Sequence, residues 1–198
     1  MNTLVLATRN RHKIEEIRTI LRDLPLEILT LNDFPDCPLL LEDGLTLEEN
    51  SLKKALAVHQ YTKFPSLADD SGLEVFYLNG RPGVRSARYA GENATDDQNN
   101  EKLLKEMRGV APRRRGAQFR AVLTLVEEGF REATEGICRG RLGESPRGTN
   151  GFGYDPIFLP EGFRGTYAEL TSEEKNRISH RARALENMRE VLNKRSGR

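Results

Sequence analysis

Two adjacent carboxylates, Asp69 and Asp70, lie inside an otherwise apolar stretch, LADDSGLEV, that begins at Leu67 and ends at Val75. Like charges repel each other and lose solvation on burial, so such a pair needs a metal ion, a proton or a hydrogen-bond donor as its partner. On an extended backbone the two side chains would point to opposite faces and serve different purposes. The plainer alternative is a tight Asp-Ser-Gly turn between two strands, and these nine residues alone favour it.

A second group of polar residues lies at the start of a predicted helix. The segment TRNRHK follows an apolar run that is typical of a buried strand and precedes isoleucines at helical spacing. A helix N-terminus offers unpaired amides and the positive end of a dipole, which suits a phosphate chain. The glycines of a P-loop are missing, and Thr and Asn before a helix are also ordinary capping residues. Phosphate binding and helix capping both remain open for Thr8, Arg9, Asn10, Arg11, His12 and Lys13.

Two charged segments have a solvated surface as their simpler interpretation. In LLEDGLTLEENSLKKA, Glu42 precedes a turn and is a candidate ligand for a hard cation, while Lys54 lies in a predicted helix. A solvated loop followed by a charged helix face explains this pattern more simply. In EEKNRISHRARAL, Lys175, His180 and Arg181 lie near a helix start from which they could reach a ligand. A solvated basic face fits that pattern equally well.

An aromatic and glycine-rich segment, TNGFGYDPIF, indicates a binding site more strongly. Glycines let the backbone approach a flat ligand closely, and aromatic rings stack on such a ligand. A purely structural turn does not need aromatic residues on both sides of its glycine. We therefore expect a ring-stacking wall with a hydrogen-bonding carboxylate, formed by Phe152, Gly153, Tyr154 and Asp155.

The composition limits the classes of function. Of the 198 residues, 31 are Lys or Arg and 30 are Asp or Glu, so neither nucleic acid nor a membrane is an expected partner. Cys37 and Cys138 lie far apart, without zinc-like spacing to the three histidines, which favours two reduced thiols. No stretch is long enough to span a bilayer, and the first residues lack a signal peptide's apolar region. We expect a cytoplasmic protein.

The order of predicted elements indicates one α/β domain over residues 1–198, built around a mixed sheet. Apolar runs predict strands over 3–8, 26–31, 66–68 and 73–78. A long hairpin is predicted over 117–142, with its turn at Glu128-Gly129.

Helices are predicted between these strands and at the C-terminus. Thr95 and Gln98 resemble a capping box that opens a helix ending near Met107. A helix after the second strand is expected to place four residues on one face, namely Leu52, Ala55, Leu56 and His59.

Taken together, these stretches resemble the inosine triphosphate pyrophosphatase family of house-cleaning nucleotide hydrolases. The matches are T-x-N-x-x-K, LADDSGLEV, SARYAG, GFGYDPIF and AEL…EEKNRISHRARAL, which occur in the family's order and run nearly end to end. The resemblance implies an α/β fold with an elongated mixed β-sheet flanked by helices, and two lobes with a substrate cleft between them. It also implies a homodimer.

By the same resemblance, the protein hydrolyses ITP, dITP and XTP to the monophosphate and pyrophosphate, and requires Mg²⁺. The implied catalytic residue is Asp70, as proton acceptor, with Glu42 and Asp70 as metal ligands and Ser71 in contact with substrate. The implied triphosphate contacts are Thr8 to Lys13 together with Lys54. The implied base contacts are Phe152, Gly153, Tyr154, Asp155, Lys175, His180 and Arg181. Because metal ligation weakens a carboxylate as a base, we expect Asp70 mainly to orient the attacking water.

The first loop departs from the family pattern, because Arg9 and His12 stand where members often carry glycine. The backbone donors of the loop can survive that change. Three alternatives remain on the residues alone. They are a pyrophosphatase for pyrimidine or modified nucleotides, a nucleic-acid-binding module around Arg113–Arg115, and a structural protein. The near-neutral charge argues against the second of these.

Overall fold

The protein is a mixed α/β structure, described here by a computed structural model that covers residues 2–38 and 40–196. Its six strands form one sheet in the order β2-β1-β3-β4-β5-β6. β1 pairs in parallel with both β2 and β3, whereas β5 and β6 are antiparallel, so the predicted mixed sheet is confirmed. The strands are β1 (Thr3–Leu6), β2 (Glu27–Thr30), β3 (Ser66–Val75), β4 (Gly116–Glu127), β5 (Phe130–Leu142) and β6 (Phe158–Pro160). The α-helices are α1 (Arg11–Leu21), α2 (Leu47–Thr62), α3 (Asp96–Glu106), α4 (Ser172–Ile178) and α5 (His180–Ser196).

The chain divides into two compact units. Unit 1 contains the described residues of segments 1–70, 121–136 and 181–198, and unit 2 contains segments 71–120 and 137–180. Strands β3, β4 and β5 each contribute one part to either unit. Two units agree with the expectation of two lobes, while the cleft predicted between the lobes stays a prediction.

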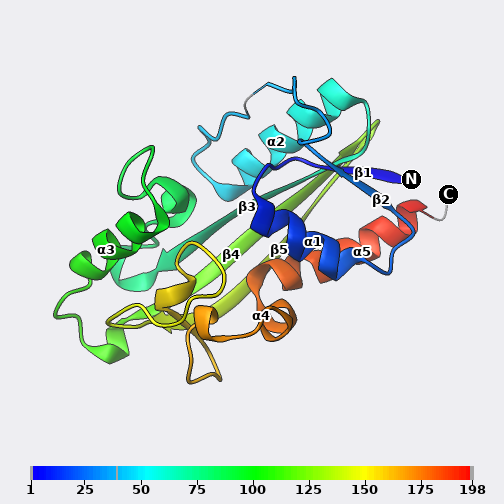
Figure 1. The fold of residues 1–198 in the computed structure, drawn as a ribbon. Coiled ribbons are helices and arrows are strands. Elements are labelled where there is room, and N and C mark those ends of the chain that lie inside the picture. The colour runs from blue at the N-terminus through cyan, green and yellow to red at the C-terminus, as the bar shows by residue number, and fades with distance from the viewer. Residues whose placement is uncertain (1, 39, 197–198) are drawn as a thin grey trace. The chain divides into compact units, whose positions relative to one another are not determined.

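Unit 1 buries both faces of strand β1. Along β1, Leu4 and Leu6 pack with apolar residues of α1 and α5, whereas Val5 packs with Ala55 and Val58 of α2. This division follows from the two-residue period of a strand, which sends successive side chains to opposite faces. Figure 1 shows α1 in blue and α5 in red side by side, with α2 apart from them. Both faces of β1 are therefore fully covered, as expected for strands in a parallel arrangement.

The face that α2 turns inward differs from the predicted one. Ala55 is buried as expected, but Leu52, Leu56 and His59 are only half-buried. The residues buried in their place are Leu47, Asn50, Ser51, Lys54, Ala55 and Val58. A helix with an inward polar stripe gives a misleading apolar pattern, because some of its apolar residues then lie at the edge of the buried face.

Strand β3 passes through the paired carboxylates without interruption. The sequence predicted strands over 66–68 and 73–78 around an Asp-Ser-Gly turn, and that turn is wrong, since one strand spans Ser66–Val75. A side chain at Gly72 has no room, because its Cβ would lie 2.2 Å from the carbonyl oxygen of Gly83. After Val75 the chain forms a 3-10 turn over Phe76–Leu78 instead of continuing as a strand.

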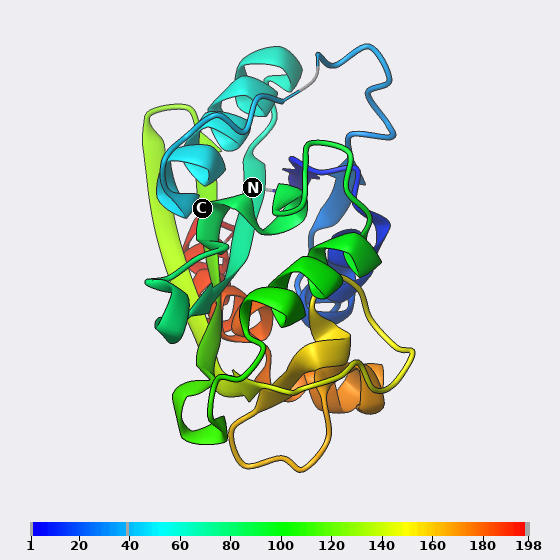
Figure 2. The same cartoon turned by 90° about the vertical axis from the view of Figure 1, so that its left-hand side faces the viewer.

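Unit 2 has its own apolar core, which includes Leu73, Leu103, Phe119, Phe158 and Tyr167. Figure 2 shows α3 in green beside the yellow segment of residues near 150, and Figure 1 agrees. The predicted hairpin is confirmed, since β4 and β5 are joined at Glu128-Gly129. The first turn of α3 carries the predicted capping box of Thr95 and Gln98. In residues 2–38 and 40–196, no helix combines the length and apolar character needed to cross a membrane.

We expect Thr95→Ala to lower the free energy of unfolding by about 1 kcal/mol, because the hydroxyl that accepts the Gln98 amide is lost. Urea denaturation monitored by circular dichroism measures this change. Asn93→Ala, an exposed position two residues earlier, is the control and should change the value by less than about 0.5 kcal/mol. Equal losses in both variants would show that the cap contributes nothing specific.

Candidate functional site

The two adjacent carboxylates of β3 have separate partners within unit 1. Asp69 is fully buried and lies between two cations. Its Oδ1 accepts a hydrogen bond from Lys13 Nζ at 2.7 Å, and its Oδ2 accepts one from Arg181 Nε at 2.6 Å. Burial by itself would raise the pKa of Asp69, but Arg181 and Lys13 together hold it well below 3.8. Asp69 therefore stays charged, and its two oxygens are used to bind Lys13 and Arg181.

Asp70 is in a different electrostatic environment. Its Oδ1 accepts from Lys54 Nζ at 2.7 Å and its Oδ2 accepts from Asn50 Nδ2 at 3.3 Å. Burial raises the pKa of Asp70 above its ordinary value, although Lys54 opposes this change. The two neighbouring carboxylates thus have pKa values displaced in opposite directions. Such a separation is typical of a site that uses one carboxylate for structure and the other for chemistry.

The Lys54 ammonium group donates hydrogen bonds to three oxygen atoms. Its Nζ lies 2.7 Å from Glu42 Oε1, 2.7 Å from Asp70 Oδ1 and 2.9 Å from the backbone oxygen of Asp69. An ammonium has three protons, so each of them is used. Burial acts to lower the pKa of Lys54, but Asp70 and Glu42 raise it above 10.5, and the side chain stays charged. A cation therefore already joins the two predicted metal ligands.

The residues present fit the metal that the resemblance implies. Glu42 and Asp70 offer carboxylate oxygens that point to one cation, and the Glu42 side chain is 37% exposed. Across the part of the chain that the structure describes, no three His, Cys, Asp or Glu side chains are grouped so that they could hold a metal ion. Mg²⁺ is commonly bound by one or two carboxylates and completes its shell with water and substrate phosphates. A full cage of protein ligands is therefore not required.

The predicted phosphate segment begins helix α1. Asn10 is the N-cap, and its Oδ1 accepts from the Lys13 amide at 3.2 Å, while Thr8 Oγ1 accepts from the Asn10 amide. Arg9 donates to the Cys37 carbonyl. Capping is thus confirmed for Asn10, whereas Thr8 binds the amide of the residue that precedes the helix. Both contacts are compatible with the phosphate role, which stays a prediction.

The remaining members of that segment divide into a surface pair and an inward lysine. Arg11 forms a salt bridge with Glu15, and both side chains are mostly exposed. His12 is exposed. Lys13 instead points inward, where its Nζ contacts Asp69. Lys13 is the member of the segment that the structure brings to the carboxylates.

The predicted base segment lies in unit 2 and is fixed by an internal salt bridge. Asp155 Oδ2 accepts from Lys175 Nζ at 2.7 Å and from the Phe152 amide at 2.9 Å. The Lys175 ammonium also lies 4.9 Å from the centre of the half-buried Phe152 ring, within the range of a cation–π interaction. Phe152 keeps accessible surface, so it is the ring in this segment that can stack on a flat ligand.

Tyr154 and His180 are less available than their sequence positions indicated. Tyr154 is 3% exposed, belongs to the core of unit 2, and donates its hydroxyl to the Ser86 carbonyl. Burial raises the pKa of Tyr154 well above 10. His180 stacks on Phe119 with a centroid distance of 4.7 Å and is also buried. Tyr154 therefore supports the segment from within and does not form part of an open stacking wall.

Arg181 also differs from its implied role beside a base. Its side chain is 1% exposed, and besides Asp69 it contacts Glu16 of α1 through Nη1. These contacts lie within unit 1 and hold α5, α1 and β3 together. Burial acts to lower the pKa of Arg181, but Asp69 and Glu16 raise it above its ordinary value. The guanidinium is thus committed to two carboxylates inside the protein.

The arginine run that suggested nucleic-acid binding does not form a free basic patch. Arg115 is buried and donates to the backbone carbonyls of Met107 and Leu142. Arg114 lies over the ring of Tyr77, at 4.6 Å from its centre. Two of the three side chains are therefore used within unit 2.

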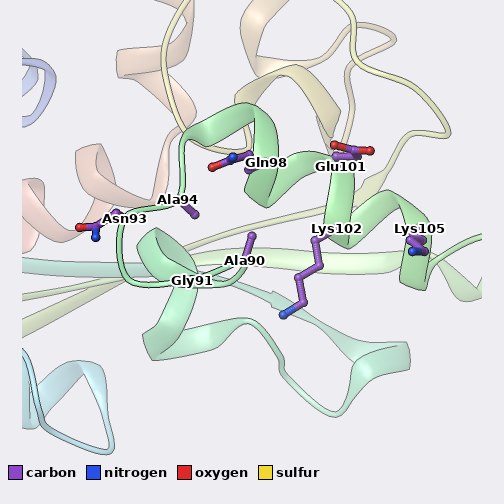
Figure 3. A pocket seen from close by; sticks show the side chains of 8 residues that line it. All are labelled: Ala90, Gly91, Asn93, Ala94, Gln98, Glu101, Lys102 and Lys105. Carbon is purple, nitrogen blue, oxygen red and sulfur yellow. The ribbon is translucent and has the colours of Figure 1, made fainter.

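A polar pocket of about 450 Å³ in unit 2 is lined by none of the predicted site residues. It lies between α3 and the segment that follows Tyr89, and Figure 3 shows Lys102 extending from the helix towards that segment. Lys102 Nζ donates to the Tyr89 carbonyl at 2.6 Å and lies 4.4 Å from the centre of the Tyr89 ring. The Lys102 ammonium group is therefore used to hold the segment at Tyr89 against α3.

Two residues of the charged cluster were missed from the sequence. Asn50 donates to Asp70 and accepts from the Gly44 amide, so it ties the Glu42 loop to β3. Its signal was its spacing, because Asn50 and Lys54 are four residues apart and share one helix face. Glu16 carried no such signal, since its partner Arg181 is 165 positions away.

The fold and the cluster define a class, namely α/β proteins with an array of ammonium and carboxylate groups beside a helix N-terminus. The chain belongs to the Ham1 family, whose model matches residues 4–191. It is 51% identical to a dITP/XTP pyrophosphatase of Geobacter sulfurreducens, over 97% of both chains. It is 47% identical to a dITP/XTP pyrophosphatase of Clostridium perfringens, over 97% of this chain and 98% of the relative. The solved structure of a HAM1 protein from Coxiella burnetii is 41% identical, with a TM-score of 0.89, over 98% of this chain and all of that one.

We expect Arg181→Met to lower the free energy of unfolding by roughly 3–5 kcal/mol, because it removes a partner from the buried carboxylate of Asp69. Urea denaturation measures the loss. The matched control is Arg177→Met, which breaks an exposed i,i+4 pair with Glu173 and should cost less than about 1 kcal/mol. A small loss for both variants would contradict a structural role for Arg181.

Proposed function

We propose that this protein hydrolyses dITP, XTP and ITP to the monophosphate and pyrophosphate, and so removes non-standard purine nucleotides from the nucleotide pool. The observation that carries the proposal is the cluster of Lys13, Lys54, Glu42, Asp69 and Asp70 in a member of the Ham1 family. Two relatives that share about half of the sequence are named dITP/XTP pyrophosphatases. The charge and type of the clustered groups suit a triphosphate and a water nucleophile.

The proposal assigns the phosphates to residues of unit 1. The Lys13 ammonium group would bind phosphate oxygens. Lys54 would bind them by exchanging one of its three protein contacts for a phosphate oxygen. Asp70 would mainly orient the attacking water, because a carboxylate that also holds the metal ion is a weak base. Asp69 would hold Lys13 in position and take no part in proton transfer. Catalysis would thus rest on positioning and charge stabilisation, as in other phosphoryl-group chemistry.

The proposal assigns Mg²⁺ to Glu42 and Asp70. When bound, the ion supplies positive charge that neutralises the phosphate oxygens and the leaving pyrophosphate. Before the ion binds, the Lys54 ammonium group lies between the Glu42 and Asp70 carboxylates and offsets their mutual repulsion. A homodimer and a cytoplasmic location complete the proposal, and both rest on the sequence.

The base is assigned to residues of unit 2. Phe152 would stack on the purine, with Lys175 and Asp155 setting the position of its ring and backbone. Ser71, half-buried on β3, and His180 stay predicted substrate contacts. Arg181 would act on the base only indirectly, because its guanidinium is bound to Asp69 and Glu16.

We predict that Asp70→Asn lowers kcat for dITP by roughly 10²-fold or more while leaving the fold intact, because an anionic group that holds the metal and orients the attacking water is lost with little change of shape. Pyrophosphate release from a nucleotide panel with Mg²⁺ measures the effect. Asp43→Asn is the matched control, since Asp43 pairs with Lys53 on the surface beside Glu42. Wild-type protein that releases no pyrophosphate from any purine triphosphate would refute the proposed function.

We predict that Lys13→Ala weakens binding of inorganic tripolyphosphate roughly tenfold or more, because a charge-assisted hydrogen bond to the anion is lost. Binding of the monophosphate product should change much less. Isothermal titration calorimetry gives both dissociation constants, with Lys53→Ala as the control for loss of one exposed charge. Equal losses for the two ligands would mean that Lys13 is structural.

A further inference from the structure

We propose that Asp96 and Asn100 of helix α3 are positioning residues that hold Gly153 and thereby place the Phe152 ring against the purine. The inference deepens the proposed function and rests on it for the identity of the ligand. Both residues lie outside the motifs that carried the family resemblance. Their role follows from contacts within unit 2.

The side chains of Asp96 and Asn100 bind the backbone amide and the backbone carbonyl of Gly153, respectively. The Gly153 amide donates to Asp96 Oδ2 at 2.7 Å. The Gly153 carbonyl accepts from Asn100 Nδ2 at 2.8 Å. Asp96 and Asn100 are four residues apart in α3, so their side chains share one helix face and can reach the same residue. The helix therefore clamps Gly153 from one side.

Gly153 connects the contacts from α3 to the stacking ring. It has a φ of +60°, a conformation that favours glycine, and it directly follows Phe152. The segment is fixed on either side of it, because the Phe152 amide bonds to Asp155 and the Tyr154 hydroxyl bonds to the Ser86 carbonyl. The Gly153 amide and carbonyl themselves are held by Asp96 and Asn100 of α3.

Helix α3, which provides the two side chains of the clamp, is itself held in position by further contacts. The capping box of Thr95 and Gln98 fixes the first turn of α3. Asn99 bonds to the Ala87 carbonyl and the Ala90 amide, so the same turn also holds the SARYAG segment. One short stretch of helix thus ties together two of the segments that match the family pattern.

The environment of Asn100 indicates that its donor group is the part in use. Asn100 is 4% exposed, and its Oδ1 has no hydrogen-bond partner among the described residues. Burial of an unpaired acceptor costs free energy, and an apolar side chain would avoid that cost. The Gly153 carbonyl fixes the orientation of the amide, since only Nδ2 can donate to it. Asn100 is therefore less favourable for stability than an apolar residue would be, and its contribution is the hydrogen bond to Gly153.

The effect of the clamp should appear in recognition of the base and not of the phosphates. Phe152 and Gly153 belong to the base segment, whereas the proposed phosphate ligands lie in unit 1. Loosening Gly153 would increase the number of positions available to the Phe152 ring. The enzyme would then lose affinity for a nucleotide, while inorganic tripolyphosphate, which has no base, would bind as before.

The test compares Asp96→Ala and Asp96→Asn with Asp97→Ala. Asp97 is the neighbouring exposed acid in the first turn of α3, so its variant controls for the loss of a charge near the helix N-terminus. Asparagine at position 96 keeps an oxygen that accepts the Gly153 amide, and alanine does not. Hydrogen exchange at the Gly153 amide, measured by NMR, reports the clamp directly without any substrate.

In Asp96→Ala we expect exchange at Gly153 to accelerate about tenfold or more, because local opening no longer has to break that bond. The KM for dITP should rise about tenfold, with kcat changed less than about twofold and inhibition by tripolyphosphate unchanged. Asp96→Asn should restore both readouts, and Asp97→Ala should resemble the wild type. Asn100→Leu, which keeps the helix face filled, should raise the KM in the same way and serves if Asp96→Ala does not fold.

The clamp is overturned if Asp96→Ala and Asp97→Ala give the same exchange rate at Gly153. It is also overturned if the KM for dITP and the inhibition constant for tripolyphosphate change together. Failure of the proposed function has a different signature, since the wild type would then release no pyrophosphate while exchange at Gly153 still responded to Asp96→Ala.

Discussion

The buried carboxylate of Asp69 is the constraint on which unit 1 depends. An isolated charge in the protein interior is prohibitively costly, so the fold must supply cations from elsewhere in the chain. Lys13 comes from α1 and Arg181 from α5, and each bonds a different oxygen of the carboxylate. The helix that begins at the predicted phosphate segment and the helix that ends the chain are thereby tied to the central strand. The contacts that position the charged groups of the site are therefore the same contacts that hold α1 and α5 to β3.

This arrangement also explains how one strand carries two like charges. Extended backbone sends Asp69 and Asp70 to opposite faces, where each meets its own cations. Asp69 is neutralised by two strong donors and becomes part of the framework. Asp70 shares Lys54 with Glu42 and keeps a raised pKa, so it remains the chemically adaptable member.

Local signals in the sequence were sufficient for some elements and insufficient for others. The capping box at Thr95 and the turn at Glu128-Gly129 were predicted because each depends on residues that are close in the chain. Strand β3 was wrongly divided because Asp-Ser-Gly favours a turn locally, while pairing with β1 and β4 on either side imposes a strand. The partner of Asp69 could not be read from spacing, because Arg181 lies 112 residues away. Residues of the site were therefore found largely through the family pattern, and their contacts only through the fold.

The three-fold coordination of the Lys54 ammonium has a consequence for chemical reactivity. An amine acts as a nucleophile only after it has lost its proton, and here every proton is held by an oxygen in a buried position. Acylating reagents should therefore label the exposed lysines of the folded protein long before Lys54. Arginine would not be an equivalent residue there, because a planar guanidinium cannot direct three donors around one point. An arginine at this position would therefore keep the positive charge but lose part of the three-fold contact.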